Sequence, residues 1–97
     1  MNQMTEKQTK KFFPIGTVVT LKDGVKPLMI YGRLQLREGS DQIFDYVSCL
    51  YPEGNISNDF NIFFGHEDVG HVLFAGYQTE EDERLQSLMC EFLRNKE

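Results

Sequence analysis

The chain has 97 residues, a formal net charge of −5 and a hydrophobic fraction of 40%, which is typical of a folded globular protein. This length allows one domain with one modest core, so a deep enzymatic cleft is not the default expectation. No apolar run approaches the roughly 20 residues of a membrane span, and the polar start of the chain does not lead into the apolar segment of a signal peptide. We therefore expect a cytoplasmic protein that does not insert into a membrane.

The charges are distributed unevenly along the chain. Residues 1–40 carry seven Lys and Arg against three Asp and Glu, whereas residues 41–97 carry three against twelve. A nucleic-acid-binding protein usually has a basic isoelectric point, and this chain has one near 5.0. Cys49 and Cys90 lack the spacing of metal ligands and are expected to be reduced. The sequence therefore predicts no nucleic-acid partner, no metal and no cofactor.

The first half of the chain is dominated by strand signals. Residues 1–11 are predicted to form a flexible basic tail, followed by a single domain over residues 12–97. A β-branched run indicates a strand at 18–21. Asp23–Gly24 then favours a hairpin, and Gly32 indicates a bulge in the strand that follows. Further strands are expected at 28–36, 43–51, 60–64 and 71–77, with a loop at 52–59.

A helix is predicted over residues 79–95, with Thr79 as its N-cap and acidic residues in its first turn. Its apolar residues follow the spacing i, i+3, i+4, i+7, i+8 and form one stripe. We expect this stripe to pack on the protein's own sheet, so that the substitution Leu88→Asp unfolds the domain; contact with another protein is the alternative. The stripe consists of Leu85, Leu88, Met89, Phe92 and Leu93.

Successive short strands followed by one terminal helix predict an α+β fold. The connections are too short for parallel crossovers, so the sheet is expected to be antiparallel. The fold class is thus a small, strongly bent antiparallel sheet of four to five strands with a C-terminal amphipathic helix.

The segment "GHEDVGH", residues 65–71, contains both histidines of the chain. His66 and His71 are five residues apart, which places the two rings about 140° apart on a helix and on opposite faces of a strand. Neither geometry suits one metal ion, so a one-turn helix or polar turn is the preferred interpretation, with Val69 and Val72 pointing inward. A metal-dependent hydrolase that uses His66, Glu67 and His71 remains the alternative.

Three blocks of sequence together resemble a bacterial family catalogued as domain of unknown function 4176. They are "PIGTVVTLKDGVKPLMIYGR" (Pro14 to Arg33), "FDYVSCLYPEGN" (Phe44 to Asn55) and "FFGHEDVGHVLFAGY" (Phe63 to Tyr77). The resemblance implies a Gram-positive protein associated with type VII secretion, acting as a cytoplasmic chaperone or adaptor without catalytic residues. Its implied partner is the helical N-terminal targeting region of a secreted toxin, with a second small helical adaptor and the secretion ATPase as further partners.

Aromatic and apolar side chains in excess of one small core predict a partner-binding surface. An amphipathic helix laid in a groove is the expected recognition mode, with one arginine and one glutamate fixing the register. An immunity protein that inhibits a toxin's catalytic domain is the alternative, favoured by the acidic second half. The predicted partner-binding residues are Phe12, Phe13, Tyr31, Arg33, Tyr51, Glu53, Phe63, Phe64, Tyr77, Leu85, Met89 and Phe92.

Overall fold

The computed structural model describes residues 11–96, which divide into two compact units. One unit is Phe13–Tyr77, and the described part of the other consists of residues 11–12 and 78–96. Apart from Lys11, the predicted basic tail lies outside the described residues. The single domain over residues 12–97 stays a prediction.

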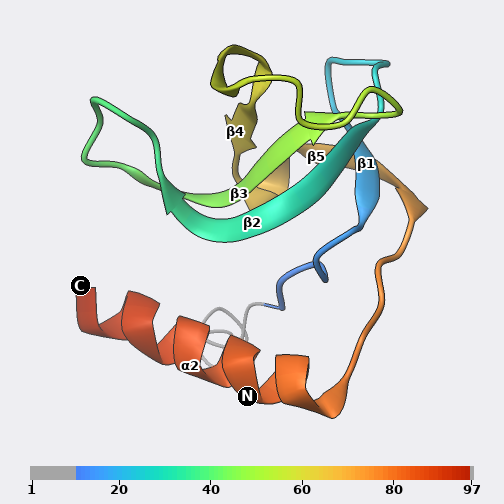
Figure 1. Ribbon diagram of the computed structural model, residues 1–97. Helices are drawn as coiled ribbons and strands as arrows, with labels where there is room; N and C mark the ends of the chain where they lie inside the picture. The colour runs from blue at the N-terminus through green and yellow to red at the C-terminus, as the bar shows by residue number, and fades with distance from the viewer. Residues whose placement is uncertain (1–10, 97) are drawn as a thin grey trace. The chain divides into compact units, whose positions relative to one another are not determined.

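The unit Phe13–Tyr77 is an open antiparallel sheet of five strands, and the described residues of the other unit include the helix α2 (Figure 1). The predicted α+β class is therefore confirmed. The strand order is β4-β3-β2-β1-β5, so β4 and β5 are the two edges. The elements are β1 Val18–Leu21, β2 Leu28–Leu36, β3 Ile43–Leu50, the 3-10 turn η1 Asn58–Phe60, β4 Ile62–Phe64, the 3-10 turn η2 His66–Asp68, β5 Val69–Phe74 and the helix α2 Glu80–Lys96.

The sheet is strongly curved because a short connection joins its two opposite edges. In a flat sheet of five strands, the edges lie about 19 Å apart. The connection from Phe64 to Val69 would span about 18 Å only if fully extended, and η2 shortens it because a 3-10 helix rises about 2 Å per residue. The sheet must therefore curl to bring β4 toward β5, and β2 bends through most of its length in Figure 1.

Part of this curvature comes from a bulge in β2. The pairing of β2 with β3 shifts register between Ile30 and Gly32, which confirms the bulge predicted at Gly32. A Cβ atom at Gly32 would lie only 2.7 Å from Cγ1 of Val47. Glycine therefore allows the two strands to approach closely at the bend.

The core of the sheet unit lies along β1, β2 and β3. Four consecutive residues of β3, from Tyr46 to Cys49, are buried, so both faces of this interior strand are covered. The edge strand β5 differs, because all of its residues except the half-buried Val69 are exposed. Val72, predicted to point inward, is 45% exposed, and that prediction is wrong. An edge strand has a neighbour on one side only, which leaves its side chains with less cover.

The segment just after β5 is hydrogen-bonded to the segment before β1. Thr17 Oγ1 donates a hydrogen bond to the carbonyl oxygen of Pro14 at 2.7 Å and accepts one from the N–H of Gly76 at 3.0 Å. A Cβ atom at Gly76 would lie 2.3 Å from the carbonyl oxygen of Ile15. This contact between two stretches of backbone leaves room for glycine alone.

The helix α2 begins where its capping signal predicts. Thr79 Oγ1 accepts a hydrogen bond from the N–H of Asp82 at 3.0 Å, which satisfies one of the unpaired amides of the first turn. The Asp82 carboxylate accepts a hydrogen bond from Gln86 Nε2 at 3.0 Å, one turn further on. Gln86 Oε1 in turn accepts the N–H of Phe12 at 2.9 Å. A buried glutamine thus ties the segment that leads into the sheet unit to the helix.

Only one margin of the predicted apolar stripe on α2 is buried. Met89 is 9% exposed and Leu93 is half-buried, whereas Leu85, Leu88 and Phe92 are 46%, 62% and 46% exposed. The predicted burial of Leu88 is therefore wrong. Apolar periodicity identifies the face of a helix that avoids water, but only part of that face is buried among the described residues.

Candidate functional site

A half-buried polar cluster surrounds His66, the first histidine of the "GHEDVGH" segment. Tyr46 Oη lies 2.6 Å from His66 Nδ1 and accepts the N–H of Phe13 at 2.9 Å. Tyr46 is fully buried. The hydrogen bond between Tyr46 and His66 therefore connects β3 to η2.

Backbone and ring contacts complete this cluster. The N–H of His66 donates to Asp45 Oδ2 at 2.7 Å, and Arg33 donates to the carbonyl oxygen of Phe13 at 3.2 Å. The Phe13 ring stacks on His66 with 4.7 Å between ring centroids and on Tyr46 with 5.7 Å. Each of these contacts orients η2 or the segment before β1 on the sheet. We interpret the cluster as a structural clamp.

The second histidine lies on a different element. His71 is exposed on β5, whereas His66 belongs to η2, which is the one-turn helix predicted for this segment. The carboxylate of Asp68 accepts the N–H of Gly65 at 2.9 Å and so closes its own turn. Within residues 11–96, no three His, Cys, Asp or Glu side chains are grouped as a metal site would require. The geometry gives the metal-dependent hydrolase hypothesis no support.

Replacing Tyr46 with phenylalanine is expected to cost about 2 kcal/mol at neutral pH, because it removes the hydrogen bonds that the buried Tyr46 hydroxyl makes with Phe13 and His66. Burial raises the pKa of Tyr46 above its ordinary 10.0. The unfolded chain then ionises first as the pH rises, so the stability that this group contributes is present below pH 10 and lost above it. Urea unfolding of both proteins at neutral pH and near pH 11 measures the effect.

The Tyr46→Phe variant should therefore lose less stability between the two pH values than the wild type does. Tyr77→Phe is the matched control, since Tyr77 is 87% exposed and should show no change at neutral pH. An equal loss of stability on alkalinisation in the wild type and in Tyr46→Phe would contradict the assigned role of burial.

The predicted partner-binding residues fall into three groups by exposure. Phe12, Phe64 and Met89 are buried, so these three side chains are not exposed for contact with a partner. A second group is half-buried: Phe13, Arg33 and Phe63, of which Phe13 and Arg33 belong to the clamp. The third group is exposed: Tyr31, Tyr51, Glu53, Tyr77, Leu85 and Phe92.

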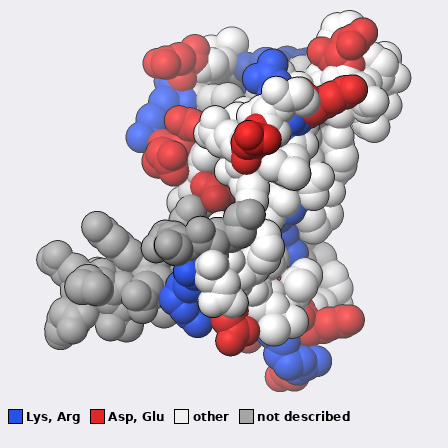
Figure 2. Space-filling view, turned by 90° about the vertical axis from the view of Figure 1, so that its left-hand side faces the viewer, with Lys and Arg blue, Asp and Glu red and all other residues white. Residues whose placement is uncertain are grey.

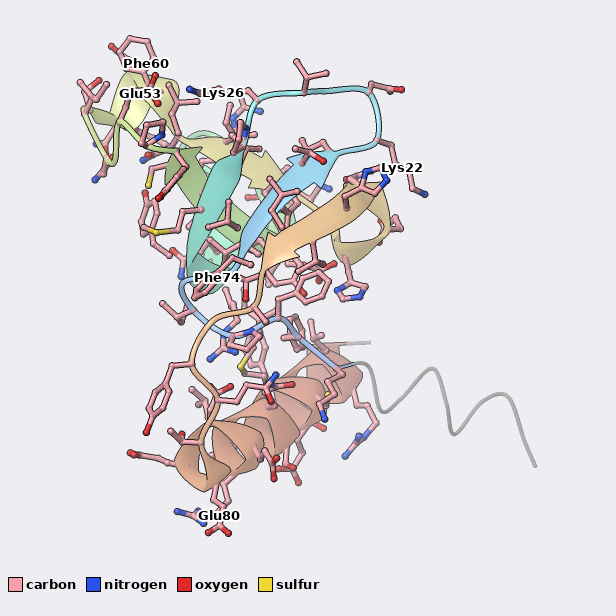
Figure 3. The ribbon with its side chains drawn as sticks, turned by 90° about the vertical axis from the view of Figure 1, so that its right-hand side faces the viewer. Lys22, Lys26, Glu53, Phe60, Phe74 and Glu80 are labelled. Atoms are coloured by element: carbon pink, nitrogen blue, oxygen red, sulfur yellow. The ribbon has the colours of Figure 1, made fainter. Side chains whose placement is uncertain are left out.

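Glu53 is held by an ion pair at the end of the sheet. Lys26 Nζ lies 2.9 Å from its carboxylate, and the two side chains meet in Figure 3. The hydrogen bond from Lys26 lowers the pKa of Glu53. Both side chains are largely solvated, so the pair contributes little to stability.

Sequence reasoning missed several exposed apolar residues. Leu88 was assigned to the stripe but expected to be buried. On β5, Val72, Leu73 and Phe74 are consecutive and exposed, and Figure 3 places Phe74 at the end of this edge strand. In a strand that is buried on one face, apolar and polar residues alternate. Three consecutive apolar residues depart from this pattern, and this departure is the signal that could have indicated the exposed edge.

The charged side chains do not form a field of one sign on the face shown in Figure 2. Lys and Arg are interspersed there with Asp and Glu among the described residues. This arrangement offers no basic path for a phosphate backbone. A candidate binding site is the exposed ridge of Leu85, Leu88 and Phe92 on α2, called the α2 ridge below.

Most of the chain matches a known family of protein domains. Residues 12–85 match the family described as Domain of unknown function (DUF4176). No curated protein and no solved structure matches the chain. Within residues 11–96, no helix combines the length and the apolar character that crossing a membrane would need.

Proposed function

The chain belongs to the DUF4176 family of domains of unknown function, and we propose that it is a cytoplasmic, non-enzymatic adaptor for a type VII secreted toxin. In this proposal it binds the helical N-terminal targeting region of the toxin, the client, and helps to deliver it to the secretion ATPase. A second small helical adaptor joins the complex. The family resemblance supports this context, and the α2 ridge supports the mode of binding.

The α2 ridge is the single observation that carries the proposal. Its three side chains are between 46% and 62% exposed, although apolar residues of this size are usually buried. They lie within an arc of about 60° around the helix axis, since each residue advances by about 100°. The ridge is therefore a narrow, continuous apolar surface, which marks a site of protein–protein contact better than scattered residues do.

The spacing of the ridge favours a helix as the bound element. Leu85, Leu88 and Phe92 stand at i, i+3 and i+7, the repeat with which one helix packs along another. Seams of this kind bury leucine and aromatic side chains between side chains of the facing helix. An amphipathic helix of the client fits this repeat, whereas an extended peptide has a period of two.

Co-expression with the toxin encoded beside this protein tests the proposal. The toxin is divided into its N-terminal and C-terminal halves, and each half is captured by affinity and analysed by size exclusion. We expect co-elution with the N-terminal half. Co-elution with the C-terminal half alone would instead support an immunity protein, and binding to neither half would remove the toxin as the client.

A further inference from the structure

We propose that, without a client, two copies of the chain associate through the α2 ridge, with their helices antiparallel. The ridge residues occupy positions that repeat as the first and fourth places of a heptad, which is the pattern of a coiled-coil seam. In an antiparallel pair, a first-place residue faces a fourth-place residue. Leu85 of each copy then packs against Leu88 of the other, and two identical layers form around a twofold axis.

The charges beside the ridge support a second copy as the occupant. Arg84 and Glu91 are exposed and seven residues apart, so both lie on the same flank of the ridge. With Leu85 set against Leu88 of the second copy, the antiparallel register brings Arg84 opposite Glu91 of that copy. The twofold axis repeats this pair, so both charges on the flank are complemented by the same register that aligns the leucines.

The residues on the other flank of the ridge explain why the second copy binds on the flank of Arg84 and Glu91. Met89 and Gln86 lie on the other flank and are buried, and Gln86 holds the N–H of Phe12. The exposed residues that flank the ridge on its other side are Arg84 and Glu91. Phe92 lies at the end of the seam and covers the stem of Glu81 of the second copy in this register.

The seam is short, so the association should be weak and dependent on concentration. We expect dissociation constants of tens to hundreds of micromolar, on the order of the affinities of small interfaces. Sedimentation equilibrium of the full chain over a concentration series should show a mass that rises from 11.3 kDa toward twice that value. A mass that stays at 11.3 kDa at all concentrations would overturn the proposal.

Charge reversal tests the register as well as the association. Arg84→Glu places two pairs of glutamates in contact and Glu91→Arg two pairs of arginines, so each variant should dimerise about tenfold more weakly than the wild type. An equimolar mixture of the two variants should regain wild-type association, because each pair of facing charges is then complementary. The exchanged variant Arg84→Glu/Glu91→Arg should also associate like the wild type.

These variants control for one another. All substitutions lie on the exposed side of α2, and circular dichroism checks that each variant keeps its helix. If the exchanged variant is folded but does not associate, or if either single variant dimerises like the wild type, the antiparallel register is wrong. The experiment contains no client, so its outcome is independent of the proposed adaptor function, although both concern the same ridge.

Discussion

The Leu88→Asp variant is expected to remain folded and to bind the N-terminal half of the toxin at least about a hundredfold more weakly. Leu88 is 62% exposed, so an aspartate there keeps its hydration in the free protein. The cost to the fold is limited to the lower helix propensity of aspartate, about 0.5 kcal/mol. In the complex the same carboxylate would be buried against an apolar helix without a partner, which is strongly unfavourable.

Isothermal titration of both proteins with the captured toxin half measures the loss, and urea unfolding checks the fold. Val25→Asp is a matched control, because Val25 is 92% exposed and lies in the hairpin connection outside α2. It should change neither binding nor stability. If the Leu88→Asp variant unfolds instead, Leu88 is buried as the apolar periodicity predicts. That result would contradict a binding role for the ridge.

Replacing Gly76 with alanine is expected to destabilise the sheet unit by about 3 kcal/mol, the upper part of the range for overpacking. The new Cβ atom would lie 2.3 Å from the carbonyl oxygen of Ile15 and 3.0 Å from the nitrogen of Thr17. Both are backbone atoms that no rotamer change can move. The end of β5 must therefore shift, and the hydrogen bond from Gly76 to Thr17 Oγ1 is lost with it.

The loss should appear as a lower midpoint of urea unfolding, by about 2 M for a domain of this size. Gly24→Ala is the matched control, since no atom lies within 4 Å of its added Cβ and its φ is not in the left-handed region. Equal midpoints for Gly76→Ala and the wild type would show that the backbone contact relaxes at little cost.

Signals local in the chain predicted local structure well. The capping pattern at Thr79 placed the start of α2, and Asp23–Gly24 marked the hairpin between β1 and β2. Each depends on residues only a few positions apart. The bulge at Gly32 was predictable for the same reason, because glycine inside an apolar strand usually marks a bend or a close approach.

Features that join distant segments were not predictable. His66 and Tyr46 are adjacent only because β3 pairs with β4, so their hydrogen bond cannot be predicted from the spacing of residues in the sequence. The exposure of Leu88 was missed for a related reason. Periodicity shows that a face is apolar, but whether the same chain covers it depends on surfaces that the pattern does not contain.

The pairing of β5 with β1 has a consequence for the order of folding. Val18 is opposite Phe74, whereas the strands from β1 to β4 pair with their neighbours in sequence. A contact between such distant residues closes a long loop. The entropic cost of closing this loop must be offset before the contact adds to the stability of the fold. We therefore expect β5 to dock after the hairpins have formed, so that substitutions in β5 mainly accelerate unfolding and leave the refolding rate nearly unchanged.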